Sequence, residues 1–383
     1  MSLPIYNQDL GIIGILAQSA TTYTDCITFT GETSDFTLKA TNKEWDGTVE
    51  YSTDHNTWKV WNGSEISSSN KKLYLRGSGN TTFCTRNGAR FVLSARAACS
   101  GNIQTLLEYS NPPATTLADF CYRYMFNGCT SLTKAPELPA TTLAGTCYEY
   151  MFSGCTSLTQ APALPATTLA NYCYRYMFNG CTSLTKAPAL PATTLANYCY
   201  YGMFNGCTSL TKAPALPATT LAGSCYDYMF SGCTSLTQAP ALPATTLANY
   251  CYEYMFRGCT SLTQAPALPA TTLAYYCYRY MFNGCTSLTK APALPATTLA
   301  DFCYECMFKG CTSLKISTTQ SSEYPTAWRI PSSGTISSTF TNWNYDMLTG
   351  TGGTFTSNPS INTTYYGAFS SSTAGYTDTV TPL

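Results

Sequence analysis

The chain has 383 residues and balances 20 Lys and Arg residues against 20 Asp and Glu residues, so its formal net charge is zero. Only 10% of the residues are charged, against about 25% in an ordinary soluble domain. This balance excludes a protein that binds nucleic acid through its phosphates, because such binding needs clustered Lys and Arg. No run approaches the ~20 apolar residues that span a bilayer, so we predict no membrane insertion.

Residues 1–19 form the first predicted segment. They lack the positively charged start of a secretory signal, and Asp9 precedes their single apolar stretch, Ile12–Ala17. We therefore expect a chain that does not use the general secretory route. We interpret 1–19 as a docking segment through which the chain contacts other structural proteins of a larger particle.

Residues 20–95 predict a small antiparallel β domain. Phe36–Ala40 and Thr48–Tyr51 flank the turn Trp45–Gly47, which predicts a β-hairpin. His55 follows Asp54 in a later turn and could act as a base. Because no motif supplies a nucleophile, we interpret His55 as an exposed turn residue.

From Cys121 to Leu314 a 26-residue unit repeats eight times, and a repeat this strict predicts stacked coils. Each unit begins with two cysteines eight residues apart, and the strings MF, GCTSL and PATTL each occur eight times. In the first unit Cys121, Met125 and Cys129 follow the spacing i, i+4, i+8. This spacing predicts a short helix over Cys121–Asn127 with one buried face.

The rest of each unit predicts extended arms. Pro136 and Pro139 of the first unit exclude a second helix and favour an extended chain on either side of a bend. Because one coil cannot bury its own apolar stripe, neighbouring coils must share a core. The fold class that we predict is therefore a mixed α/β repeat solenoid, in which each coil consists of a strand and a short helix.

Both flanks of the repeats depart from the unit. Residues 96–120 predict a degenerate N-terminal capping coil. Residues 315–383 are rich in Ser, Thr, Gly and aromatic side chains, and short alternating runs such as Thr339–Trp343 indicate weak strands. We interpret 315–383 as a β-rich cap or tip.

The spacing Met/Phe-x-x-Cys-x-x-Leu, followed by a proline-rich segment, resembles the BspA-like leucine-rich-repeat family of bacterial surface proteins and phage-borne relatives. The resemblance covers Cys121–Leu314 strongly and Cys99–Asp119 weakly. The unit departs from the family in its 26-residue length and in Ala where Ile is commoner. The resemblance implies a right-handed curved solenoid with adhesive or binding roles, and it does not imply catalysis.

The chain contains 20 cysteines. Two cysteines eight residues apart on a helix lie about 12 Å apart, too far for a disulfide, and their spacing does not suit zinc. We predict ladders of buried thiols, with disulfides between neighbouring coils or metal sites as the alternatives, and no cofactor. Cys26, Cys84 and Cys306 lie outside the ladders and are the candidates for a reactive thiol.

The sequence predicts no enzymatic activity. No serine-hydrolase, phosphate-loop or dinucleotide motif occurs. Glu149, Asp227, Glu253 and Glu305 occupy one position in different copies, which we interpret as a solvated surface rather than a catalytic pair. The Thr141–Thr142 pairs predict a structural ladder rather than an ice-binding face, because adjacent threonines on a strand point in opposite directions.

Residues around the first cysteine vary among the eight copies, while the core positions hardly change. The variation is either drift on a solvated surface or a binding face rich in Tyr, Arg and Asn, which suits sugars or protein partners. The predicted binding residues are Arg123, Tyr172, Arg175, Tyr198, Tyr201, Tyr250, Arg257, Tyr275, Tyr276 and Arg279. The alternative face is the row Lys134, Gln160, Lys186, Lys212, Gln238, Gln264 and Lys290.

These observations predict a non-enzymatic structural and adhesive protein. We expect a phage fibre or virion decoration protein that presents its repeats to a glycan or protein of the host cell surface. The alternative is a BspA-type adhesin on the bacterial cell surface, and a polysaccharide-degrading enzyme is a remote alternative. A homo-oligomer, such as the trimer common among fibres, stays open.

Overall fold

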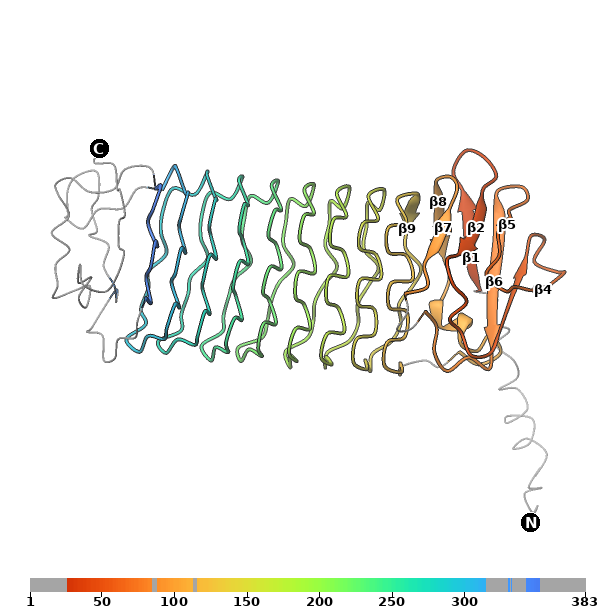
Figure 1. Ribbon diagram of the computed structural model, residues 1–383, viewed down its shortest axis with the longest axis horizontal. Helices are drawn as coiled ribbons and strands as arrows, with labels where there is room; N and C mark the ends of the chain where they lie inside the picture. Colours follow the sequence, from red (N-terminus) through yellow and green to blue (C-terminus); the bar gives the residue numbers. More distant parts are fainter. Residues whose placement is uncertain are drawn as a thin grey trace, which may run out of the picture.

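The computed structural model describes residues 26–84, 88–112, 116–314, 330, 332 and 342–351. The predicted docking segment 1–19 and most of the predicted tip 315–383 lie outside these residues. Figure 1 shows a β-rich end followed by coils that stack in a nearly straight row, rather than in the curve that the resemblance implies. No helix in the described part of the chain is long and apolar enough to cross a membrane.

Two sheets pack together at the β-rich end. The first has the strand order β4-β3-β6-β1-β8-β9, and the second has the order β5-β2-β7. The strands are β1 (Ile27–Gly31), β2 (Thr37–Ala40), β3 (Thr48–Ser52), β4 (Lys59–Val60), β5 (Ile66–Ser67), β6 (Lys72–Ser78), β7 (Phe91–Leu93), β8 (Ala97–Ser100) and β9 (Leu132–Lys134).

The predicted hairpin around Trp45–Gly47 is wrong, because its two strands belong to different sheets. β2 pairs with β5 and β7, whereas β3 pairs with β4 and β6. The intervening turn crosses between the sheets because Trp45 stacks in the core on Trp61 and Phe83, with ring centroids 5.3 Å apart in both pairs. Burial of this indole outweighs the local turn preference.

The β-rich end continues into the coils without a break. β8 pairs in parallel with β9, which belongs to the first repeat. A short 3-10 helix, η1 (Ile103–Leu106), follows β8. The Phe91 amide donates to the Met125 carbonyl at 2.7 Å, and the ring of Phe29 lies 6.3 Å from that of Phe126. The hydrophobic core is therefore continuous from the sheets into the repeats.

Neighbouring coils, which we number 1 to 8 from Cys121 to Cys303, are joined through alternate backbone amides. In coil 2 the amides of Tyr150, Phe152 and Gly154 donate to carbonyls of coil 3 at 2.7–2.9 Å. The intervening amides donate three residues back within their own coil, as Met151 does to Tyr148 at 3.1 Å. Half of the backbone amides in this segment therefore depend on the next coil for a hydrogen-bond acceptor.

This bonding overturns the predicted helices. An α-helix bonds each amide four residues back, and the described residues contain no α-helix. Instead φ is positive at every fourth residue, as at Tyr172 (62°), Tyr176 (53°) and Gly180 (69°). A left-handed conformation costs a non-glycine residue about 1–2 kcal/mol, and the bonds to the next coil offset this cost. The Cys-x3-Met-x3-Cys stripe reflects a chain of four-residue turns.

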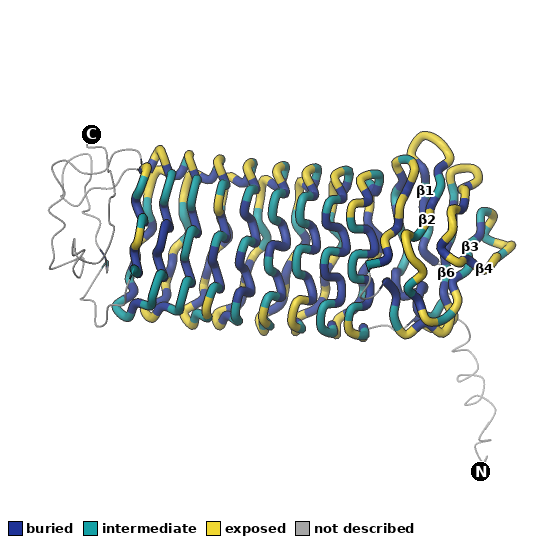
Figure 2. Tube along the Cα trace, in the orientation of Figure 1, coloured by how far each residue is buried: buried dark blue, intermediate teal, exposed yellow. Residues whose placement is uncertain are grey.

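Identical side chains stack from coil to coil inside the row. The Phe rings from Phe126 to Phe308 lie 5.5–5.8 Å apart and nearly parallel. The inner tyrosines, which directly follow each first cysteine from Tyr122 to Tyr304, lie 5.8–6.0 Å apart. Figure 2 shows that buried residues recur at the same places in every coil.

All twenty cysteines lie among the described residues, and each is buried as a free thiol. The predicted burial is confirmed, and the structure adds a role. The second cysteine of a coil donates its thiol to the Phe carbonyl of the preceding coil, as Cys207 does to Phe178 at 3.1 Å. Burial raises the pKa of Cys84 well above its usual value and that of Cys306 to about 11, so neither fits the predicted reactive thiol.

Residues 342–351 add a further coil segment where we predicted weak strands. The amides of Tyr304, Cys306 and Phe308 donate to carbonyls of this segment at 2.7–3.0 Å, in the pattern of the earlier coils. Gly350 has φ of 75°, as Gly310 does, and lies against it. The strand expected at Thr339–Trp343 is therefore wrong for residues 342 and 343, which continue the stack.

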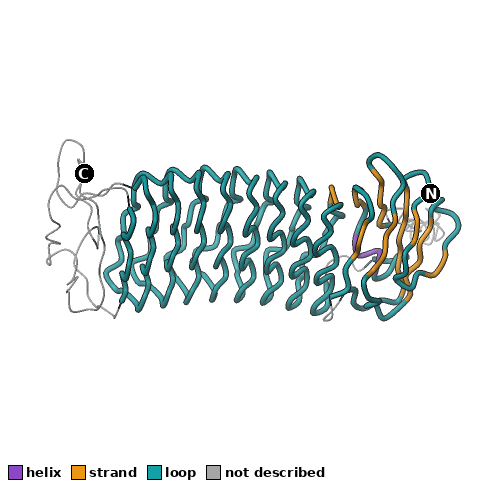
Figure 3. Tube along the Cα trace, turned by 45° about the horizontal axis from the view of Figure 1, so that its top comes forward, coloured by secondary structure: helices purple, strands orange, loops and turns teal. Residues whose placement is uncertain are grey.

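The threonine pairs also differ from expectation. Both members of a pair are exposed, as at Thr167 and Thr168. Their arm is not a regular strand (Figure 3) and forms only isolated bridges, such as Thr142 to Thr168. Strand alternation therefore does not apply to them.

Cys207→Ala is expected to lower the free energy of unfolding by about 1–2 kcal/mol, because it removes a buried sulfur and its hydrogen bond. Urea unfolding followed by circular dichroism measures the change. Thr208→Ala, at the neighbouring exposed position, serves as the control and should change stability by less than about 0.5 kcal/mol. Equal effects of the two substitutions would contradict the packing role.

The thiols are expected to react slowly in the folded protein, because burial raises the pKa of thiols such as Cys181, to about 12. A thiol reagent at pH 8 should modify few cysteines in the native state and all 20 after denaturation. Rapid native modification of the ladder cysteines would contradict their burial.

Candidate functional site

Three rows of side chains outside the core form what we call the tyrosine face. Row A is the residue before each first cysteine: Phe120, Thr146, Tyr172, Tyr198, Ser224, Tyr250, Tyr276 and Phe302. Row B is the second residue after it: Arg123, Glu149, Arg175, Tyr201, Asp227, Glu253, Arg279 and Glu305. Row C is the third: Tyr124, Tyr150, Tyr176, Gly202, Tyr228, Tyr254, Tyr280 and Cys306.

The four-residue turns explain why these rows lie outside the core. The first cysteine, the inner tyrosine, Met and Phe all point inward and are buried in every coil. Rows A and C occupy the positive-φ positions between them. Each row then runs along the stack because backbone amides of one coil donate to carbonyls 25 residues ahead, as Tyr150 does to Arg175, and so hold neighbouring coils in register.

The first ion-pair group in row B centres on Glu149. Its Oε1 accepts from Arg175 Nη1 at 2.8 Å, and its Oε2 accepts from Arg123 Nε at 2.5 Å. Glu149 is only 2% exposed. A carboxylate this buried needs charged partners, and the two neighbouring coils supply them.

The second group centres on Arg279, which bridges two carboxylates. It donates to Glu253 at 2.9 Å and to Glu305 at 2.7 Å. Although burial lowers the pKa of Arg279, its hydrogen bonds to Glu305 and Glu253 raise it overall. Burial raises the pKa of Glu253, and the hydrogen bond from Arg279 opposes this.

The interpretation of the row B acids as a solvated surface is therefore wrong. Glu149, Asp227, Glu253 and Glu305 are all buried. Three of them pair with arginines of adjacent coils, and Asp227 makes no ion pair among the described contacts. Burial, followed by repulsion from Glu253, raises the pKa of Asp227 to about 9.

The outer tyrosines of row C stack on one another and hold the arginines. Tyr124 and Tyr150 lie 5.0 Å apart, and Tyr228 and Tyr254 lie 4.4 Å apart. The Arg175 guanidinium lies 5.2 Å from the ring of Tyr176, within cation–π range. Row C thus presents a partly exposed surface of phenol rings and guanidinium groups.

The ten predicted binding residues form one connected set through these contacts. Eight of them belong to rows A and B, and four of those are joined in two contacts: Tyr172 with Tyr198 at 4.8 Å, and Arg279 with Tyr276 at 4.6 Å. The exposed Arg257 approaches the set at the ring of Tyr254, 5.7 Å away. The remaining members, in the order of the chain, are Arg123, Arg175, Tyr201, Tyr250 and Tyr275.

Sequence reasoning missed the row C tyrosines and the paired acids. The signal was present in the alternation of Arg123, Glu149 and Arg175 at 26-residue intervals. Opposite charges at equivalent positions of adjacent coils predict pairing, as cross-strand pairs do in a sheet.

The alternative Lys/Gln row lies beside open grooves between the proline-rich arms. One groove, of about 550 Å³, has Gln160 and Lys186 on its border, and a second, of about 380 Å³, has Lys134 and Gln160. Alanine and proline side chains line most of both. This surface offers few polar groups that could fix the orientation of a ligand.

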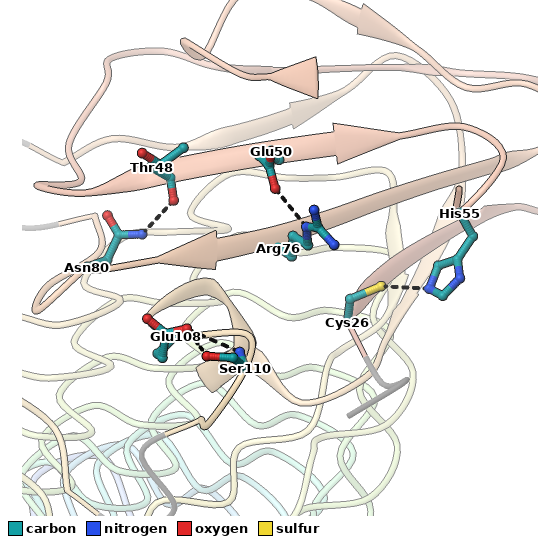
Figure 4. A network of polar contacts seen from close by, with 8 residues as sticks. All are labelled: Cys26, Thr48, Glu50, His55, Arg76, Asn80, Glu108 and Ser110. Carbon is teal, nitrogen blue, oxygen red and sulfur yellow. Dashed lines mark hydrogen bonds and ion pairs between the residues drawn. The ribbon is translucent and has the colours of Figure 1, made fainter. Parts of the chain in front are cut away.

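A separate polar cluster lies on the six-stranded sheet (Figure 4). The Arg76 guanidinium lies 4.1 Å from the ring of Trp58 and pairs with Glu50 at 2.7 Å. Cys26 Sγ lies 3.5 Å from His55 Nε2. His55 is half-buried rather than exposed as expected, because its ring packs 4.8 Å from that of Tyr74.

Asp54 does not complete a catalytic arrangement with His55. Its Oδ1 accepts from the backbone amides of Asn56 at 2.9 Å and Thr57 at 2.7 Å. The amides of Thr57 and Asn56 hold the pKa of Asp54 well below its usual value. In the described residues no three His, Cys, Asp or Glu side chains are arranged to hold a metal ion.

The contribution of Asp227 to the free energy of unfolding is expected to fall as pH rises between about 4 and 9. In this window the unfolded chain has released the Asp227 proton, whereas the folded protein retains it up to about 9. Asp227→Asn should therefore raise stability at pH 8 by about 1–3 kcal/mol and leave it unchanged near pH 4. Denaturant unfolding at both pH values measures this, with exposed Glu65→Gln as the control; an equal shift at both pH values would contradict it.

Comparison with known protein families identifies the kind of repeat. A family model described as BspA type leucine rich repeat region, in six copies, matches residues 121–237 and 176–315. The two matches together span 121–315, just over half of the 383 residues. No curated protein and no solved structure matches the chain. The chain therefore belongs to the BspA-type leucine-rich-repeat family.

Proposed function

We propose that this chain is a non-catalytic adhesive protein that uses its tyrosine face to bind a host cell surface. Its family is one of surface or adhesion-type repeat proteins and is typically non-enzymatic. The observation that carries the proposal is the continuous surface of outer tyrosines and arginines along the stack. Tyr172, for example, is 36% exposed. Partly exposed, rigid aromatic side chains with arginines beside them are typical of binding surfaces.

The rigidity of the stack supports this function. Every coil is fixed to the next through its backbone and its stacked rings, so the face loses little conformational freedom when it binds. A repeated surface also contacts a repeated ligand at several points, which raises the overall affinity. Cell-surface glycans and dense arrays of surface proteins both provide such repetition.

We propose further that the protein is carried by a phage-like particle, as a fibre or a decoration protein. The support is the sequence of 1–19, which contains a short apolar stretch, Ile12–Ala17. That segment is the proposed contact with other particle proteins, and trimerisation is part of the same proposal. Immunogold electron microscopy tests where the protein is located. Gold on particles supports the phage-like particle, and gold confined to the bacterial envelope favours the adhesin alternative.

Replacing row A tyrosines is expected to weaken adhesion without unfolding the protein. Coil 2 carries Thr146 in this row, so Tyr172→Thr, Tyr250→Thr and Tyr276→Thr introduce a side chain that the coil accepts. The triple variant should bind labelled host cells at least about tenfold more weakly, with an unchanged thermal midpoint.

The matched control changes the threonine ladder instead. Thr142→Ala, Thr168→Ala and Thr194→Ala alter three exposed positions outside the tyrosine face. This variant should bind cells as the wild type does. Full cell binding by the row A variant, or equal loss in both variants, would overturn the tyrosine face as the adhesive surface.

A further inference from the structure

The tyrosine face has one irregular place, at coil 4. There the charged position of row B holds Tyr201 and the tyrosine position of row C holds Gly202. Tyr201 meets Tyr176 edge-on, at 5.1 Å and 76°, and meets Tyr228 at 5.7 Å and 45°. Other neighbouring row C rings lie within 22° of parallel. The Tyr201 ring is therefore not stacked between two parallel rings, as the Tyr150 ring is between those of Tyr124 and Tyr176.

Two polar atoms without partners flank this place. Arg175 in coil 3 has a buried Nε, and Asp227 in coil 5 has a buried Oδ1, and neither atom makes a hydrogen bond. The Arg175 guanidinium lies 5.4 Å from the Tyr201 ring. Asp227, which is 4% exposed, influences the Tyr201 hydroxyl electrostatically from the other side. Unsatisfied buried groups are rare and costly in folded proteins.

The two flanking groups select the kind of ligand. Arg175 would repel a cation, and its charge is already paired with Glu149, so an anion would gain little there and would meet Glu253 on the other side. A hydroxyl group both donates and accepts hydrogen bonds, so a neutral polyol suits both neighbours. The phenol ring between them offers an apolar surface with a polar edge, which suits the C–H face of a sugar ring.

We propose that coils 3 to 5 hold a subsite for one neutral pyranose ring of a host glycan. The sugar stacks on Tyr201, one hydroxyl accepts from Arg175 and another hydrogen-bonds to the carboxyl group of Asp227. This inference rests on the proposed adhesive function and names its ligand class. The raised pKa of Asp227, about 9, is consistent with it, because a protonated side chain offers no charge to attract a cation.

The most discriminating variant gives coil 4 the row B and row C residues that other coils have. Tyr201→Arg combined with Gly202→Tyr recreates the string CYRYMF that begins coils 1, 3 and 7. The new guanidinium would pair with Asp227, and the Tyr176 ring, which would clash with a Cβ at position 202, would turn to stack on the new tyrosine. The thermal midpoint should therefore stay close to that of the wild type. Binding of neutral sugars should fall at least about tenfold. If the irregularity at coil 4 had only a structural role, this double variant would bind neutral sugars as well as the wild type does.

Single substitutions assign the parts of the subsite. Tyr201→Ala should weaken binding at least about tenfold and Tyr201→Phe should retain most of it, because the platform survives. Asp227→Leu should weaken it similarly, whereas Asp227→Asn keeps hydrogen-bonding capacity. Tyr109→Ala, which truncates a half-buried tyrosine at the β-rich end, outside the tyrosine face, is the matched control and should stay within about twofold of the wild type.

The probe is an array of immobilised oligosaccharides of three kinds: neutral hexoses, uronic or sialic acids, and free amino sugars. We expect the full-length protein to bind members of the neutral class, with affinities then measured by calorimetry. Binding to no sugar, to charged sugars only, or equal loss in Tyr201→Ala and Tyr109→Ala would overturn the subsite.

Host-cell adhesion separates the two proposals. If the wild type and Tyr201→Ala adhere equally well and the array stays empty, the subsite is wrong and the adhesive function stands. If the wild type binds neutral sugars but does not adhere to host cells, the proposed function is wrong and the subsite stands.

Discussion

The structure depends on backbone amides that cannot be satisfied within one coil. In the cysteine-containing segment every second amide donates to the next coil, as Phe152 does to Met177. This requirement fixes neighbouring coils at one spacing and in one register, so equivalent side chains stack on each other. Apolar rings and thiols gain contact area from such stacking, and the core repeats with little variation.

The same register has a different effect on charges. Like charges at equivalent positions would lie side by side in a poorly solvated row, which is unfavourable. Row B therefore alternates in sign around Glu149 and around Arg279, and each group satisfies itself. Between the two groups the alternation stops at Tyr201 and Asp227. At this place two polar atoms, Arg175 Nε and Asp227 Oδ1, have no hydrogen-bond partner within the protein.

Much of the burial pattern could be predicted from the sequence, while the local backbone could not. A helix advances 100° per residue, so positions four apart differ by about 40°. A chain of four-residue turns returns to the same direction each time. Over Cys121, Met125 and Cys129 the two patterns bury the same residues, and only the hydrogen bonds distinguish them. The hairpin predicted around Trp45 was wrong for another reason. The indole of Trp45 packs in a core with Trp61 and Phe83, which are distant in the sequence.

The sequence by itself determined that the units stack, because a strict 26-residue repeat with one apolar stripe per unit has no other way to bury that stripe. It also indicated the variable face around the first cysteine. Only the tertiary structure decided that the acids of row B are buried, that three of them are paired, and that Asp227 and Arg175 are left with unsatisfied atoms. The physical reason is that a charge is satisfied by its neighbours in space, here 26 residues away along the chain, and not by the residues beside it in sequence.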